Sequence, residues 1–60
     1  MLSYQTNENG SSQLDFNTKT GKFEVILYPN GKKRIFKSYY FYKHAVRVLF
    51  KYRKKYKLNY

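Results

Sequence analysis

The clearest alternation of apolar and polar positions lies in residues 39–57, YYFYKHAVRVLFKYRKKYK. Plotted at about 100° per residue, this segment separates into two arcs. The basic arc holds Lys43, Lys54, Arg47, Lys51, His44 and Lys55. The opposite arc is mostly apolar and holds Val48, Phe41, Tyr52, Ala45, Tyr56, Leu49, Tyr42 and Val46. The spacing predicts an amphipathic helix over residues 39–57, with a row of cations on one face and core contacts on the other.

Four residues do not follow this division, and a fifth marks the start of the helix. Tyr40 and Leu58 fall within the basic arc and Phe50 lies at its edge, so partial exposure is expected for these three. Arg53 lies among the apolar positions. Ser38 occupies the expected N-cap position, because a serine hydroxyl can accept a hydrogen bond from an early helical N–H group.

Two apolar runs before this helix predict a β-hairpin. Residues 22–28, KFEVILY, are rich in β-branched and aromatic side chains, and residues 32–39, KKRIFKSY, resemble them across the turn at residues 29–31. A two-residue Asn-Gly turn would pair Val25 with Phe36. That register places Phe23, Val25, Leu27 and Phe36 on one face, and Ile26, Tyr28, Ile35, Lys33 and Lys37 on the other. A type I turn with a glycine bulge, which suits the Pro-Asn-Gly sequence, would slip the pairing by one residue.

The N-terminal segment is polar. Residues 1–13, MLSYQTNENGSSQ, contain Asn-Gly and Ser-Ser pairs and few β-branched residues, which predicts a mobile tail. Leu14 and Phe16 alternate with polar neighbours, as in a short edge strand. Residues 14–60 then form one α+β domain, a β-hairpin or three-stranded antiparallel sheet packed against one C-terminal amphipathic basic helix.

The net charge narrows the choice of partner. The chain has 60 residues, with 13 Lys and Arg against 3 Asp and Glu, and a formal net charge of +10. Every Lys and Arg lies at or after Lys19, whereas residues 1–18 carry only Glu8 and Asp15 among charged side chains. A polyanion would relieve the self-repulsion of such a basic domain. Nucleic acid, either DNA or RNA, is therefore the expected partner, followed by an anionic membrane surface.

The same composition argues against several other classes of function. Three acids, one His and no Cys offer little material for a catalytic pair, a metal site or a cofactor site, so neither an enzyme nor a small-molecule substrate is expected. No apolar run approaches the roughly 18 residues of a transmembrane segment. The N-terminus lacks the features of a signal peptide, so an intracellular location, cytoplasmic or nucleoid-associated, is expected.

Basic residues interleaved with aromatic ones form the candidate site. Cations neutralise phosphates, and tyrosine rings stack on unpaired bases. The helical row of Lys43, Arg47, Lys51 and Lys54 contains no acid, although solvated helix faces usually mix both signs. The expected nucleic-acid contacts are Lys22, Lys33, Arg34, Lys37, Lys43, Arg47, Lys51, Lys54, Lys55, Tyr28 and Tyr40.

Residues 39–42 are four consecutive aromatic residues at the start of the predicted helix. They cannot all face inward from one helical turn, so at least one ring is expected on the surface. An exposed ring can stack on a base or enter a protein interface. The alternative is a strand-to-helix corner that packs on the hairpin.

Residues 21–50 resemble the plant ethylene-response-factor (APETALA-type) DNA-binding domain and the three-stranded N-terminal domains of phage and transposon integrases. The likeness rests on Gly-Lys-Phe at residues 21–23, Gly-Lys-Lys-Arg-Ile at residues 31–35 followed by Phe36, and the Ala-Val pair at residues 45–46. The resemblance implies a sheet laid in the major groove with the helix behind it. Its implied contacts are Lys22, Lys33, Arg34 and Lys37.

Two other functions remain open from the sequence. The chain could be a basic subunit of a larger assembly, such as a ribosome-like particle, in which the tail and aromatic residues become ordered on docking. It could also bind a protein or membrane surface through exposed aromatic side chains, for example as an inhibitor of a nucleic-acid-binding enzyme.

Overall fold

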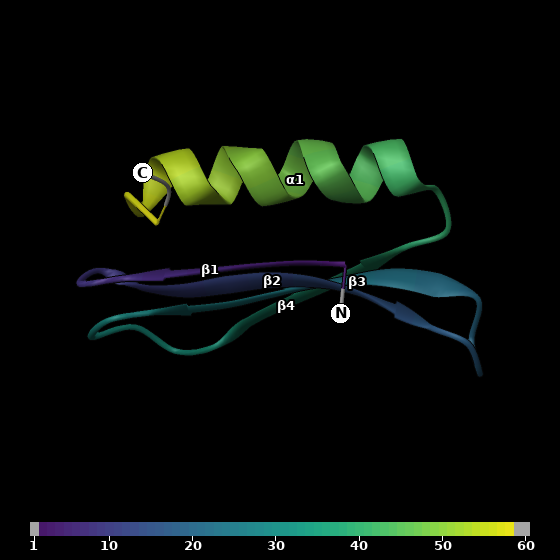
Figure 1. Ribbon diagram of the computed structural model, residues 1–60, viewed down its shortest axis with the longest axis horizontal. Coiled ribbons are helices and arrows are strands. Elements are labelled where there is room, and N and C mark those ends of the chain that lie inside the picture. Colours follow the sequence, from purple (N-terminus) through teal and green to yellow (C-terminus); the bar gives the residue numbers. More distant parts are fainter. Residues whose placement is uncertain (1, 59–60) are drawn as a thin grey trace.

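The alternating strands place their apolar side chains against a single helix. The computed structural model describes residues 2–58, and Figure 1 shows them as a four-stranded antiparallel sheet with one helix across one face. The elements are β1 Ser3–Asn7, β2 Gly10–Asn17, β3 Lys22–Pro29, β4 Ile35–Tyr39 and α1 Tyr42–Lys55. The predicted α+β class, with a C-terminal helix packed on an antiparallel sheet, is confirmed. Met1, Asn59 and Tyr60, which the predicted tail and domain included, lie outside the described residues.

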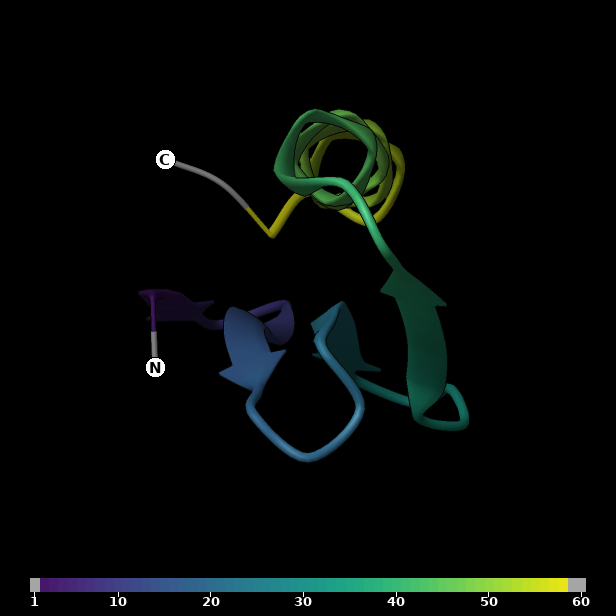
Figure 2. The same cartoon turned by 90° about the vertical axis from the view of Figure 1, so that its right-hand side faces the viewer.

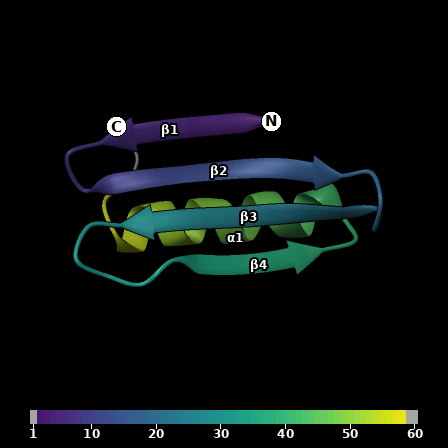
Figure 3. The same ribbon diagram turned by 90° about the horizontal axis from the view of Figure 1, so that it is seen from below.

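The strands follow one another in chain order, β1-β2-β3-β4, so each strand pairs with the next one along the chain (Figure 3). The helix contacts β2, β3 and β4. The core between the two layers consists of fully buried aliphatic side chains: Leu14, Val25, Leu27, Ala45, Leu49 and Leu58. The other side of the sheet, called here the open face, has no described segment packed over it (Figure 2).

The polar N-terminal segment forms strands, so the expectation of a tail over residues 1–13 is wrong for the part that the structure describes. In β1 the half-buried Ser3, Gln5 and Asn7 alternate with exposed side chains. These buried positions are polar, and two of the three side chains form hydrogen bonds to the C-terminal part of the chain. Arg53 Nη2 donates to Ser3 Oγ at 3.1 Å, and Asn7 Nδ2 donates to the Lys57 carbonyl at 3.1 Å. The segment expected as a short edge strand belongs to the longer, internal β2.

The β3–β4 hairpin is confirmed, and its register lies one residue away from the pairing that a two-residue Asn-Gly turn predicts. Val25 lies opposite Lys37, and Leu27 lies opposite Ile35. The register with a two-residue Asn-Gly turn is therefore wrong. Because a one-residue shift moves every side chain to the other face, Ile35 packs on the core and Phe36 lies on the open face.

The slip arises after the turn, because residues 32–34 belong to neither strand and contain one residue more than the two-residue turn would leave there. The turn is also not the predicted type I turn with a glycine bulge. The Lys32 N–H donates to the Pro29 carbonyl at 3.1 Å, and Gly31 has a φ of 74°. A positive φ at the third residue is the requirement of a type II turn, which glycine meets without strain. Pro29 remains the last residue of β3 in this arrangement.

The helix begins later than the sequence predicts. Tyr39 ends β4, and the N-cap residue is Phe41, with extended backbone angles of φ −110° and ψ 133° and no side-chain hydrogen bond. The expected Ser38 cap is therefore wrong. Tyr39 pairs with Phe23 as the last residue of β4, so the chain is still extended where the first helical turn was expected.

The helix also ends earlier than expected and closes with a left-handed residue. Lys57 has a φ of 57°, and the Leu58 N–H donates to the Arg53 carbonyl at 2.7 Å. This 6→1 hydrogen bond is the signature of a Schellman motif, which turns the chain back toward the core. Leu58 is fully buried as a result, and its expected partial exposure is wrong.

Candidate polyanion-binding surface

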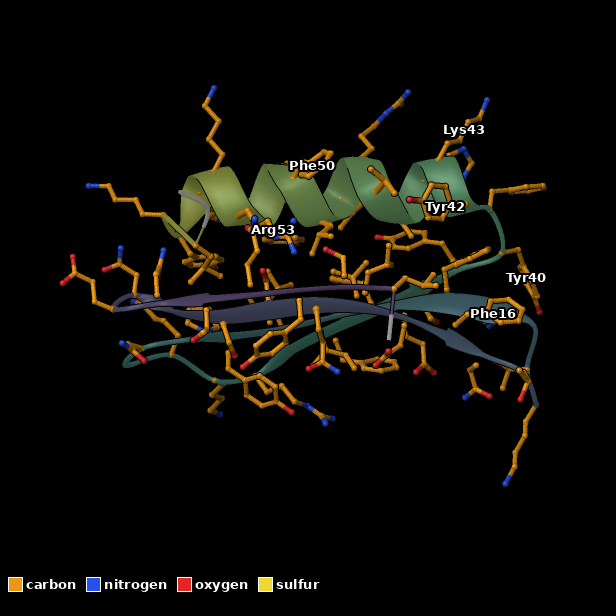
Figure 4. All side chains as sticks on the ribbon, viewed as in Figure 1. Phe16, Tyr40, Tyr42, Lys43, Phe50 and Arg53 are labelled. Carbon is orange, nitrogen blue, oxygen red and sulfur yellow. The ribbon has the colours of Figure 1, made fainter. Side chains whose placement is uncertain are left out.

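The outer face of α1 carries the densest row of cations. Ala45 and Leu49 are buried against the sheet, which fixes the rotation of the helix. Figure 4 shows Lys43 projecting away from the sheet, whereas Arg53 points toward it. The row consists of the exposed residues Lys43, Arg47, Lys51 and Lys54. At 1.5 Å per residue it extends for about 16 Å along the helix.

No carboxylate lies within this helix, because Tyr42–Lys55 contains neither Asp nor Glu. The three acids occupy other parts of the molecule. Glu8 lies in the turn between β1 and β2, while Asp15 and Glu24 lie opposite each other in register on the open face. The sheet therefore separates Asp15 and Glu24 from the cationic row, and the outer face of α1 keeps a single sign of charge.

One aromatic side chain lies beside the row. Phe50 is exposed, and the Arg53 guanidinium carbon lies 5.9 Å from its ring centroid. Its exposure agrees with its predicted place at the edge of the basic arc. A ring flanked by cations can contact the apolar part of a bound ligand while Lys and Arg hold charged groups.

Arg53 stabilises the packing of α1 on the sheet and is not part of the exposed cationic row. Its side chain is only 3% exposed, and Nε donates to Ser12 Oγ at 2.7 Å. Burial lowers the pKa of the Arg53 guanidinium, because removal from water disfavours the charged form. Arg53 thus connects α1 to β2 through Ser12 and to β1 through Ser3.

The remaining predicted contact residues are spread over other surfaces. Lys33 and Arg34 lie in the exposed loop between β3 and β4. Lys37 lies on edge strand β4, on the helix side of the sheet, and is exposed. Lys55 is exposed near the end of α1, with Nζ 5.5 Å from the ring centroid of Tyr56. The open face carries Lys22 and Tyr28, so the predicted residues do not form one continuous site.

The aromatic residues at the strand-to-helix corner are largely exposed, as the sequence predicts for at least one of them. Tyr40, Phe41 and Tyr42 are all exposed, while Tyr39 packs against the core. The assignment of Phe41 to the core face of the helix is therefore wrong, because the helix starts at Tyr42 and leaves Phe41 outside it. Tyr42 does lie on the side of α1 that faces the sheet, with its ring edge-on to Phe23 at 5.4 Å between centroids, although it remains exposed. Lys22 Nζ lies 4.8 Å from the ring centroid of Tyr40.

The sequence prediction missed two rings on the open face. The predicted tail leaves Tyr4 outside the sheet, and the register with a two-residue turn puts Phe36 on the same face as the core residues Val25 and Leu27. Both are exposed on the open face. The alternation of β1 and the Pro-Asn-Gly turn were the signals that could have identified them.

Several classes of site have no representative in the described part of the chain. Residues 2–58 contain no group of three or more His, Cys, Asp or Glu side chains that could hold a metal ion, and no pocket. No helix in this range is long and apolar enough to cross a membrane.

No protein-family model, curated protein or solved structure matches the chain. The resemblance to the ethylene-response-factor and integrase domains therefore extends only to a small antiparallel sheet followed by a C-terminal helix.

Proposed function

We propose that this chain is a non-enzymatic nucleic-acid-binding protein that contacts phosphates mainly through the outer face of α1. The observation that carries the proposal is the row of four exposed cations on a helix without a carboxylate. The cations of the β3–β4 hairpin add secondary contacts.

The physical basis is counterion release. Each phosphate that a Lys or Arg neutralises frees condensed counterions, so affinity falls as the salt concentration rises. The logarithm of the association constant falls linearly with the logarithm of the salt concentration, and this salt slope is about −0.9 per contact on duplex DNA and about −0.7 on single strands. Four contacts from the helix row correspond to a slope of about −3 to −4. The rigid helix holds the cations along a line, which suits the regular spacing of a phosphate backbone.

The test compares two charge-reversal variants with the same change in net charge. Arg47→Glu/Lys51→Glu alters the helix row, and Lys33→Glu/Lys37→Glu alters the hairpin. Anisotropy titrations with duplex DNA, single-stranded DNA and duplex RNA at two salt concentrations measure affinity and salt slope. The helix variant is expected to lose about ten- to a hundredfold in affinity at low salt and about two units of slope. On duplex DNA and duplex RNA the hairpin variant is expected to lose less affinity.

The two variants also separate the competing binding modes. A larger loss from the hairpin variant would favour the sheet-in-groove mode, whose contacts would be Lys22, Lys33, Arg34 and Lys37. Equal losses would mean that only net charge matters, which contradicts the proposed site. A salt-independent affinity, or no binding to any nucleic acid, would overturn the proposed function. All four substituted residues are exposed, and thermal melts by circular dichroism verify that the variants fold.

A second candidate is a binder of protein or membrane surfaces, and the exposed corner aromatics Tyr40, Phe41 and Tyr42 favour it. In that case substitution of these rings, and not of the helix cations, would remove binding. The assembly-subunit alternative predicts instead that the protein purifies with RNA until nuclease treatment.

A further inference from the structure

The open face of the sheet carries exposed aromatic rings on one half. Tyr4, Tyr28 and Phe36 are 52%, 46% and 45% exposed. Tyr4 and Phe36 belong to one row across the four strands, which register places as Tyr4, Gln13, Ile26 and Phe36. Tyr28 follows Ile26 by two residues along β3 and shares its face. These three rings and Ile26 define the ring half of the open face.

Three cations border the ring half. Asp15 and Glu24 lie on the other half together with Lys22, and the third acid, Glu8, lies in the β1–β2 turn at the same end as the three cations. The β3–β4 loop next to the ring half carries Lys32, Lys33 and Arg34, all of them exposed. The Arg34 guanidinium carbon lies 5.7 Å from the ring centroid of Phe36. Asp15 and Glu24 pair with each other in the adjacent row, on the side away from this loop.

The two carboxylates already have amide partners. Gln13 Nε2 donates to Asp15 Oδ2 at 2.9 Å, and Asn17 Nδ2 donates to Glu24 Oε2 at 3.2 Å. A long polyanion laid flat over the whole open face would bring its phosphates against these groups. A short segment that stays on the ring half avoids them.

We propose that the ring half binds unpaired nucleobases, with the phosphates of the same strand over Lys32, Lys33 and Arg34. This inference rests on the proposed function and adds to the helix row a second surface, on the opposite side of the sheet, whose ligand class is single-stranded nucleic acid. Base faces are available for stacking only where the bases are unpaired, and each stacked base contributes roughly ten- to a hundredfold in affinity. Tyr28 and Phe36 are on adjacent strands at a diagonal spacing of about 7–8 Å, so each can hold a separate base.

Charge complementarity favours a single-stranded nucleic acid on the ring half over a second copy of the chain or an anionic lipid surface. A second copy of the chain would bring another net charge of +10 to the cationic loop. An anionic lipid surface would extend over the whole face and meet Asp15 and Glu24. A short single strand can place its bases on the exposed rings and its phosphates beside the cations of the loop, without reaching Asp15 or Glu24.

The test uses two double variants that each remove one Tyr and one Phe from the surface. Tyr28→Leu/Phe36→Leu alters the ring half, and Phe41→Leu/Tyr42→Leu removes two rings that are even more exposed, 64% and 55%, from the corner. Anisotropy is measured with a single-stranded oligonucleotide, with a duplex of the same length and, by competition, with inorganic polyphosphate, which has no bases. Circular dichroism melts verify folding.

The ring-half variant is expected to bind the single strand about ten- to a hundredfold more weakly, with unchanged salt slope and unchanged affinity for duplex and polyphosphate. The corner variant is expected to stay within about twofold of the parent for every ligand. A ring-half variant that binds the single strand as the parent does, while polyphosphate still binds, overturns this inference and leaves the proposed function standing. Failure of the parent to bind any of the three polyanions overturns both.

Discussion

Arg53→Ala is expected to lower the free energy of unfolding by about 2–4 kcal/mol. The substitution removes a side chain that is 3% exposed and leaves a cavity between α1 and the sheet. It also removes the Nε–H group from which Ser12 Oγ accepts a hydrogen bond at 2.7 Å, and Ser12 is itself fully buried. A domain of this size has a total stability of only about 3–9 kcal/mol, so the variant should lose a large share of it.

Arg53→Met separates the volume of the side chain from its charge. Methionine refills much of the cavity and avoids the cost of burying a guanidinium, a cost that is visible in the lowered pKa of Arg53. We therefore expect Arg53→Met to lose less stability than Arg53→Ala. Adding Ser12→Ala should recover more, because the serine hydroxyl then no longer needs a partner.

Urea unfolding followed by circular dichroism measures these differences. The lowered pKa means that the charged form is penalised at every pH below that pKa, and arginine loses its proton only far above neutrality. The difference between the native chain and Arg53→Met should therefore stay constant between about pH 5 and pH 9. Equal losses for the Ala and Met variants, or no loss for either, would contradict this role for Arg53.

The elements that the sequence predicts correctly are those whose pattern is local. The alternation of Phe23, Val25 and Leu27 is enough to identify β3, because period-two burial needs only the strand itself. The period of the C-terminal segment likewise identifies α1 and the cationic row from Lys43 to Lys54. For these parts, side-chain type and spacing carry the information directly.

The sequence predicts a tail in place of β1 and the start of β2, because the side chains that these residues bury are polar and their partners lie far along the chain. Ser3 lies 50 positions from its partner Arg53, and Ser12 lies 41 positions away. Asn9 Nδ2 donates to the Lys57 carbonyl at 3.0 Å across 48 positions. A segment with polar buried positions resembles a disordered tail until its distant hydrogen-bond partners are known.

The candidate contact surfaces divide in the same way. The outer face of α1 depends only on helical period, so its cations could be identified in advance. The ring half depends on the register of β4 and on the existence of β1. An error of one residue moved Phe36 to the wrong face, and the tail assignment removed Tyr4 from the sheet altogether.

Gly10→Ala is expected to destabilise the protein by about 2–4 kcal/mol, again a large share of the total stability. Gly10 begins β2 with a φ of 133°, a conformation that residues with a side chain rarely adopt. A Cβ atom at this position would lie 2.2 Å from the Tyr28 carbonyl oxygen and 2.9 Å from the Pro29 Cα. Both are backbone atoms of the paired strand, so relief requires the strands to move apart.

Gly21→Ala is the matched control, because Gly21 also has a positive φ, of 72°, but no atom within 4 Å of the added Cβ. Its free energy of unfolding should fall only by the cost of placing an alanine in the left-handed conformation, about 1–2 kcal/mol. Urea unfolding measures both variants, and equal losses would show that backbone conformation alone, and not close packing of β2 on β3, requires glycine at position 10. A larger loss for Gly10→Ala is the expected result, because the added Cβ would force β2 away from β3 and carry with it β1, which pairs with no strand but β2.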